Sequence, residues 1–279
     1  MAFEPLEPIH LPPLEVASET FLLRSAQPAF GAPLTVSINS MVIRGAEPLV
    51  LDTGTLANRA AWLADLTSLL DPAEVRWVFL SHDDDDHTGN LAQVLELCPA
   101  ATLVTSWAAA ERMASAIAVP PGRMRWIDDG GTFDIGDRQL HALRPPVYDS
   151  PTTRGLFDPT TGVYWASDAF ATPMPAEPVD RVDDLPSELW SEGMAMFHHH
   201  VLCPWLSIVD RDAYATSVAK LRAIDPGVIV GAHTPLITGR FLASAFDHLA
   251  ALPDVAPPPH PDQGALNAAI AGRAAQAVT

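Results

Sequence analysis

Short apolar stretches alternate along the chain with longer stretches of helical periodicity. The short stretches are rich in β-branched and aromatic residues, so they predict buried strands. We expect these strands at residues 21–27, 34–44, 48–51, 75–80, 101–105, 132–135, 139–143, 162–166 and 228–230. The longer stretches predict amphipathic helices. We expect these helices at residues 56–70, 88–97, 106–117, 182–200, 211–223 and 242–252.

The order of these elements predicts an α/β fold. Strands that alternate with helices pack between them, and two sheets with outer helices form an αββα sandwich. We expect this domain at residues 18–252, after a Pro-rich arm at residues 1–17. Residues 253–279 are expected to form a Pro-rich linker and an Ala-rich, weakly helical tail.

One predicted strand ends in an unusual density of potential metal ligands. The apolar run 75–80 is followed, after Ser81, by the six residues His82 to His87, four of which are aspartates. Ligands at the end of a strand are held by rigid backbone and open into a loop, which suits a metal site. A run of aspartates alone is more often a solvated loop. The histidines that flank it favour the metal site.

This stretch, with three others, resembles a known family. His82, Asp84, Asp86 and His87 have the spacing of the signature of the metallo-β-lactamase superfamily. The other matching segments appear in the order of that family, and the four together cover residues 35–240. They are Leu51–Gly54, Ser167–Phe170 and Gly231–Pro235. The resemblance implies the αββα sandwich of metallo-β-lactamase type.

Two ligand positions are similar to the di-iron branch of that family, the flavodiiron and oxygen-binding di-iron proteins. Most hydrolases of the superfamily carry histidine where Asp84 stands, whereas the di-iron branch carries a carboxylate, usually glutamate. The family pattern also has a third histidine upstream of Asp168. No histidine lies between Ala142 and Phe197 here, and the spacing of the di-iron branch leads to Asp149. His141 is the alternative for this position.

The resemblance implies two metal subsites. His82, Asp84 and Asp149 would hold one metal ion, Asp86, His87 and His233 the other, and Asp168 would bridge them. Four carboxylates would offset the charge of two divalent ions, and a bridging hydroxide would then make the centre negative and a poor Lewis acid. Such an oxygen-rich shell favours iron, with manganese and zinc as alternatives.

Several residues near the expected ligands are candidates for supporting roles. Asp52 ends a strand and is expected to hydrogen-bond a ligand histidine, the alternative being a simple turn. Asp83 and Asp85 alternate with the ligands, so they should point away from the metals and be solvated or hydrogen-bonded. The candidates for proton donors are Tyr148, which precedes Asp149, and two histidines of the run 197–200, His199 and His200. The alternative for that run is a polar helix end.

The charge and composition limit the classes of partner that this chain can bind. The formal net charge is −18 and Lys220 is the only lysine, so the surface repels nucleic acid and anionic membranes. No apolar run reaches about 18 residues, and the N-terminus lacks the pattern of a signal peptide. We therefore expect a cytoplasmic protein without a membrane span, with Cys98 and Cys203 as free thiols.

These observations predict a non-haem di-iron protein. It would bind or reduce O₂, NO or a peroxide, or use O₂ on a small molecule, with electrons from a separate partner. The alternatives are a binuclear metallohydrolase acting on an ester, thioester, amide or lactone, and an O₂ sensor without turnover. The sequence does not decide the substrate, the electron donor or the oligomeric state, and a homo-oligomer is compatible with it.

Overall fold

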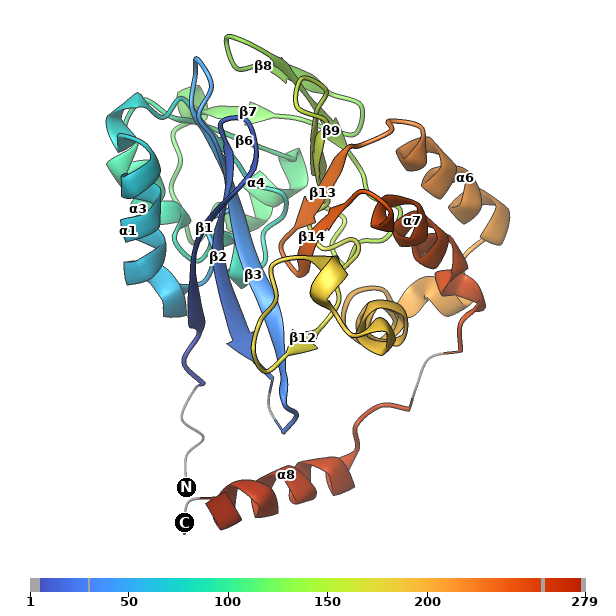
Figure 1. The fold of residues 1–279 in the computed structure, drawn as a ribbon. Helices are drawn as coiled ribbons and strands as arrows, with labels where there is room; N and C mark the ends of the chain where they lie inside the picture. The colour runs from blue at the N-terminus through green and yellow to red at the C-terminus, as the bar shows by residue number, and fades with distance from the viewer. Residues whose placement is uncertain (1–5, 30, 257–258, 277–279) are drawn as a thin grey trace.

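The computed structural model describes residues 6–29, 31–256 and 259–276. In this part of the chain two β-sheets face each other and helices cover their outer faces (Figure 1). The first sheet has, in spatial order, β1 (Ile9–Ala17), β2 (Thr20–Pro28), β3 (Leu34–Ile43), β4 (Leu49–Leu51), β5 (Trp77–Phe79), β6 (Thr102–Thr105) and β7 (Met124–Trp126), and β12 (Met174–Pro175) also pairs with β3. The second sheet has β14 (Thr234–Thr238), β13 (Val228–Gly231), β11 (Val163–Trp165), β10 (Gly155–Asp158), β9 (Gln139–Leu143) and β8 (Thr132–Asp134).

The helices pack on the two outer faces. The α-helices are α1 (Arg59–Leu69), α2 (Asp85–Thr88), α3 (Leu91–Leu97), α4 (Trp107–Met113), α5 (Met194–Phe197), α6 (Arg211–Arg222), α7 (Phe241–Ala251) and α8 (Gln263–Gln276). Helices α1, α3 and α4 share a buried cluster with the first sheet, and α6 and α7 share another with the second sheet. The predicted αββα sandwich is therefore confirmed.

The neighbouring strands β4 and β5 are largely buried because their alternate residues pack into two apolar layers. In β4, Leu51 packs between the two sheets, whereas Val50 packs under the helices of the first sheet. In β5, Phe79 and Val78 divide in the same way. Because successive side chains of a strand point to opposite faces, both positions must be apolar. This is why these strands are continuous apolar runs in the sequence.

The register of the parallel strands brings distant segments to one edge. Leu51 pairs with Phe79 in the first sheet, and Trp165 pairs with Val230 in the second. Asp52 and Ser81 therefore follow neighbouring strand ends in one sheet, and Asp168 and His233 do so in the other. The crevice at the carboxyl ends of strands is where ligands bind in many α/β proteins.

Some elements differ from the prediction. Strands β1, β7, β10, β12 and β14 are not expected from the sequence pattern. Pro235 argues against a strand, and β14 tolerates it because β14 is the edge of its sheet. Gly155 in β10 is needed because a Cβ there would lie 2.7 Å from the Tyr164 hydroxyl. The glycine therefore marks a close approach of strands.

The predicted helix at residues 182–200 was wrong in form. Pro186 interrupts it, because the residue before proline favours extended backbone and Leu185 adopts it (φ −82°, ψ 136°). The region contains instead a 3-10 helix, a π-helix, α5 and a second π-helix: η4 (Val182–Asp184), η5 (Leu189–Gly193), α5 and η6 (His198–Leu202). Short 3-10 helices occur elsewhere as η1 (Leu56–Asn58), η2 (Pro72–Glu74), η3 (Pro121–Arg123), η7 (Pro204–Ile208) and η8 (Leu252–Asp254).

The two ends of the described chain differ in how they relate to the sandwich. Residues Ile9–Ala17, within the stretch expected as an arm, form the edge strand β1 and pair with β2. Helix α8 lies apart from the two sheets, below the sandwich in Figure 1. Among the residues placed by the structure, no helix has the length and apolar character that a membrane crossing requires.

Candidate metal centre

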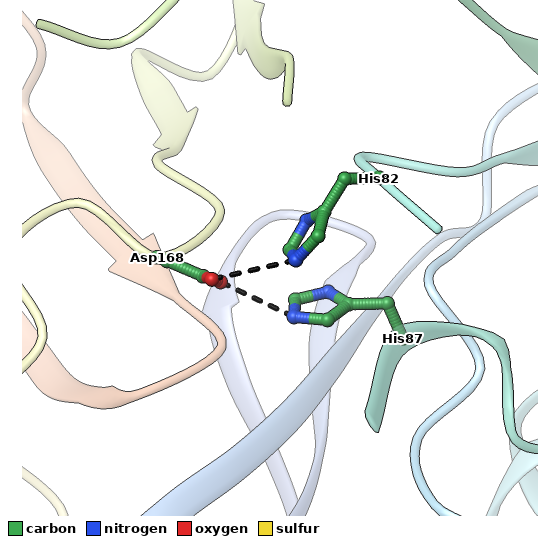
Figure 2. A group of neighbouring side chains, drawn as sticks. All are labelled: His82, His87 and Asp168. Carbon is green, nitrogen blue, oxygen red and sulfur yellow. Dashed lines mark ion pairs between the residues drawn. The ribbon is translucent and has the colours of Figure 1, made fainter. Parts of the chain in front are cut away.

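Three side chains from two sheets meet at the strand ends. Figure 2 shows the rings of His82 and His87 pointing at the carboxylate of Asp168. His82 follows β5, His87 lies in the short helix α2, and Asp168 follows β11. Residues separated by more than 80 positions thus face one another because the two sheets stack.

The carboxylate of Asp168 lies between two sets of ligands. Its Oδ2 is 3.4 Å from His82 Nε2, and its Oδ1 is 3.2 Å from His87 Nε2 and 3.6 Å from His233 Nε2. In the described part of the chain, Asp168 Oδ1 and the Nε2 atoms of His82 and His87 are buried without a hydrogen-bond partner. Buried polar atoms without partners are costly, and atoms converging on one point fit a metal ion that would satisfy them.

The first set, the histidine-rich group, consists of Asp86, His87 and His233. Asp86 Oδ2 lies 3.1 Å from His233 Nε2 and 3.7 Å from His87 Nε2. One ligand atom from each of the three residues lies within 4.8 Å of the others. This group therefore has the size and the donors of a metal subsite.

The second set, the carboxylate-rich group, consists of His82, Asp84 and Asp149. The Nε2 atom of His82 is 3.8 Å from Asp84 Oδ2 and 3.9 Å from Asp149 Oδ2. The structure thus brings Asp149 to the group. The alternative, His141, lies on β9 opposite Phe157 and belongs to none of the metal-sized groups found in the described residues.

Each candidate ligand histidine is also held at its other ring nitrogen. His87 Nδ1 is 2.9 Å from Asp52 Oδ2, and His233 Nδ1 is 2.8 Å from the carbonyl oxygen of Ser37. His82 Nδ1 is 3.2 Å from the Ser167 hydroxyl. These contacts orient the rings so that Nε2 faces the centre, as in metal sites where an outer hydrogen bond fixes the ligand.

Asp52 makes the contact that was expected of it and a further one. Besides His87, its carboxylate accepts hydrogen bonds from the backbone N–H (2.7 Å) and the hydroxyl (2.6 Å) of Ser81. Its backbone is in the left-handed region (φ 55°), where a short polar side chain is among the few tolerated. Asp52 is therefore more than a turn residue, because it ties β4 to the ligand loop.

The histidine-rich group is electrostatically balanced without a metal. Burial opposes charge on His233, but Asp168 and Asp86 outweigh it and raise its pKa to about 9. Burial likewise opposes charge on His87, and its pKa is still raised well above the ordinary value by Asp168, Asp52 and Asp86. Burial would raise the pKa values of Asp86 and Asp168, but the nearby histidines hold both below the usual range.

The carboxylate-rich group lacks this balance. Burial, followed by the charge of Asp168, raises the pKa of Asp149 to about 6. Burial also raises the pKa of Asp84, and burial together with the charge of His87 lowers that of His82. Two carboxylates and a neutral imidazole form a site that lacks positive charge, which a metal cation would supply.

The structure does not bring the predicted histidines His199 and His200 to the centre. His199 Nε2 lies 2.9 Å from the carbonyl oxygen of Leu252, and His200 Nδ1 lies 2.9 Å from His260 Nε2. Neither residue belongs to the metal-sized groups among the described residues. The structure therefore does not support the expectation that His199 and His200 line the centre. Both make their contacts elsewhere, in the helical segment η6 and with Leu252 and His260.

The preceding residue, His198, was not predicted. It is buried, its Nδ1 donates to the carbonyl oxygen of Met194, and its Nε2 has no hydrogen-bond partner in the described part of the chain. Burial lowers its pKa to about 4, and Asp168 is close enough to act on it. Successive positions in a helical segment point in different directions, so the sequence alone could not tell which histidine of the run faces inward.

Tyr148 faces a different cavity. Its ring packs against Trp205 with 5.3 Å between the two ring centroids. The guanidinium of Arg144 lies over the Tyr148 ring, 5.0 Å from the centroid of that ring. These residues line a cavity of about 450 Å³ that also includes Lys220. The ring of Tyr148 therefore has another environment than the one expected, although its neighbour Asp149 reaches the centre.

Comparison with known proteins identifies the family of this chain and agrees with its fold. The model of the family described as ODP family beta lactamase matches residues 36–234, so the chain belongs to that family. Putative diflavin flavoprotein A 2 of Nostoc sp. is 30% identical over 142 residues, 50% of this chain and 24% of that protein. Nitric oxide reductase of Moorella thermoacetica is 21% identical over 230 residues, 78% of this chain and 57% of that protein. The resemblance to the flavodiiron branch is thus confirmed at the family level.

Solved structures show the same fold. The rubredoxin oxygen:oxidoreductase of Desulfovibrio gigas has a TM-score of 0.73 at 16% identity, covering 87% of this chain and 61% of that one. A fragment of putative diflavin flavoprotein A 5 from Nostoc sp. has a TM-score of 0.72 at 20% identity and covers 89% of this chain and 98% of the fragment. The chain spans only about a quarter of the first of the sequence relatives, 24% of its length.

Proposed function

We propose that this chain is a di-iron oxidoreductase that reduces O₂ or NO with electrons from a separate partner. The observation that carries this proposal is the position of Asp168, whose two carboxylate oxygens face two different ligand groups. Relatives that bear the names nitric oxide reductase and rubredoxin oxygen:oxidoreductase support the reaction class. A separate donor is part of the proposal because the name rubredoxin oxygen:oxidoreductase pairs oxygen with a second protein, rubredoxin.

The ligand set fits iron better than zinc. His82, Asp84 and Asp149 would hold one ion, and Asp86, His87 and His233 the other, with Asp168 shared between them. Four carboxylates beside three imidazoles compensate a high metal charge and weaken the Lewis acidity that hydrolysis needs. When bound, two iron ions would supply electrons to a diatomic substrate.

The protein residues position these ligands and control access. Asp52, Ser37 and Ser167 hold the rings of the three histidines. The three ligand histidines are buried, whereas the side chains of Asp84 and Asp86 are 45% and 31% exposed. A small substrate would therefore enter from the side of these two carboxylates, and the buried histidine side would exclude bulk water.

The test is metal content together with redox activity. Protein produced in iron-supplemented cells should contain about two irons per chain and a ferric absorption that bleaches on anaerobic reduction. The chemically reduced protein should then consume O₂ or NO, and Asp168→Ala should abolish both the absorption and the consumption. Two zinc ions in a colourless, redox-silent protein that hydrolyses esters, thioesters or lactones would contradict the proposal. Bound iron without consumption of either gas would indicate a sensor.

A further inference from the structure

Asp83 lies between two candidate ligands but points into a hydrogen-bond network of its own. From the sequence, its side chain could be either solvated or hydrogen-bonded within the protein. Its side chain is only 7% exposed, and its Oδ2 is 2.7 Å from the Nε of Arg112 on α4. Its Oδ1 accepts a hydrogen bond of 2.7 Å from the hydroxyl of Thr152. Asp83 therefore connects the ligand loop, helix α4 and the loop 144–154 that carries Asp149.

The direction of every hydrogen bond in this network follows from the carboxylate. A carboxylate only accepts, so the Thr152 hydroxyl donates to Asp83. That hydroxyl must then accept from the hydroxyl of Ser150, which lies 2.7 Å away. Ser150 in turn accepts from Arg112 Nη1 at 3.3 Å. Thr152 and Ser150 are buried, so loss of one partner leaves the others unsatisfied.

The network ends beside a candidate ligand of the carboxylate-rich group. Asp149 directly precedes Ser150, and the Thr153 hydroxyl donates to Asp149 Oδ1 at 3.4 Å. The loop is also fixed to the ligand strand, because the backbone N–H of Arg154 donates to the carbonyl oxygen of Ser81 at 2.8 Å. These contacts set the separation between His82 and Asp149, which reach the centre from different segments.

We infer that Asp83 is a positioning residue that keeps Asp149 within reach of the metal bound by His82 and Asp84. Asp83 and Arg112 do not touch the metal; they act through Ser150 and Thr152. The inference rests on the proposed binuclear centre. The histidine-rich group has no member in this network, so loss of Asp83 should impair one metal subsite and spare the other.

The experiment measures the two metal affinities separately. Full-length protein is titrated with Fe²⁺ under anaerobic conditions against a competing chelator, and bound iron is counted. Wild type should bind two ions, and Asp83→Asn should weaken one of them at least about tenfold, as for other residues that orient metal ligands. The other affinity should stay within about twofold. The control Asp85→Asn removes the same charge from an exposed neighbour and should leave both affinities unchanged.

A second comparison separates geometry from charge. Asp83→Asn leaves the positive charge of Arg112 uncompensated, and this alone would repel a cation. The double variant Asp83→Asn/Arg112→Gln removes that charge as well. Under our inference, the carboxylate-rich subsite of this double variant still binds Fe²⁺ more weakly than in wild type. If its Fe²⁺ affinity returned to the wild-type value, the effect of Asp83→Asn would be one of charge, and the inference would be wrong.

Two further variants keep the test decisive. If Asp83→Asn does not fold, Thr152→Val removes the bridging hydroxyl with little change of shape and should cause the same selective loss. In Asp149→Ala, whose carboxylate-rich group is already impaired, Asp83→Asn should have no further effect on the remaining ion. Wild type that binds two ions with Asp83→Asn unchanged overturns this inference alone. Wild type that binds no pair of ions overturns the proposed function with it.

Discussion

The two ligand groups differ in the balance of their charges. In the histidine-rich group, two buried histidines with raised pKa values compensate Asp86 and Asp168. In the carboxylate-rich group, a single histidine faces two carboxylates whose pKa values are raised. Exposure does not separate the groups, because Asp86 is 31% exposed, between Asp84 at 45% and Asp149 at 19%.

This difference shows how one centre can combine stability with reactivity. The histidine-rich group forms buried ion pairs even without a metal, so it adds to the organisation of the apo protein. The carboxylate-rich group becomes favourable only when a cation binds, because it lacks a compensating positive charge. We therefore expect the first group to act as an anchor and the second to be the subsite whose metal exchanges.

The largest effect should come from Asp168→Ala, which removes the residue common to both groups. Neither ion should bind at micromolar iron. The metal-free protein should also lose about 3–5 kcal/mol of unfolding free energy, because buried histidines lose their main counter-charge. Metal analysis and urea unfolding measure the two effects. Full metal content in this variant would show that the assigned ligand set is wrong.

The second-largest effect should come from Asp52→Ala, which acts mainly on the histidine-rich group. His87 would lose the contact at Nδ1 that orients its ring, and the affinity of the histidine-rich group should fall about 10–100-fold. The same competition titration with Fe²⁺ measures it. An equal loss at both subsites would argue for general unfolding of the strand end instead, and far-UV circular dichroism checks that possibility.

Asp149→Ala should empty one subsite and leave the other filled. Its matched control is His141→Ala, because His141 is the alternative ligand, and the structure places it on β9 away from the metal-sized groups. We expect one iron per chain in the first variant and two in the second. The reverse result would transfer the third ligand position to His141.

The pH dependence of the metal-free protein should show the imbalance of the carboxylate-rich group. The pKa of Asp149 in the folded chain is about 6, above its ordinary value of 3.8. The folded state therefore holds a proton that the unfolded state has released between these values, so stability falls as pH rises through this window. Asp149→Asn does not have this pH-dependent penalty and should be more stable than wild type by about 3 kcal/mol at neutral pH.

The gap between Asp149→Asn and wild type should close as pH falls below about 3.8, where Asp149 is protonated in both the folded and the unfolded state. Urea unfolding of metal-free protein at several pH values measures it. A gap that does not change with pH would mean that the side chain acts through packing and not through its charge.

The smallest effects should come from His200→Ala and His199→Ala. His200 is only half-buried, so its loss should change stability by less than about 0.5 kcal/mol. His199→Ala removes a buried hydrogen bond to Leu252 and should cost about 1–2 kcal/mol. Metal content and gas consumption should stay within twofold of wild type in both. A large loss of turnover with intact metal content would restore the catalytic role considered from the sequence.

Local sequence determined much of the fold. Strands such as β4 and β5 can be recognised as apolar runs because each lies between two apolar layers, so both of its faces must be apolar. Strand β14 was hidden by Pro235 and β10 by polar residues around Gly155, because edge position and close strand approach are properties of the neighbours. The domain limits proposed at residues 18 and 252 stay predictions.

The candidate ligand loop His82–His87 can be recognised from local sequence, because the proposed metal chemistry needs these side chains at this spacing. The residues that join this loop depend on tertiary contacts. The stacking of the two sheets brings Asp168 and His233 to that loop, and the fold of loop 144–154 brings Asp149 and leaves His141 aside. Tertiary packing also places Asp83 in a hydrogen-bond network and keeps the side chains of His199 and His200 out of the centre. Contacts between distant segments depend on sheet register and packing, and neither is written in a local pattern of residues.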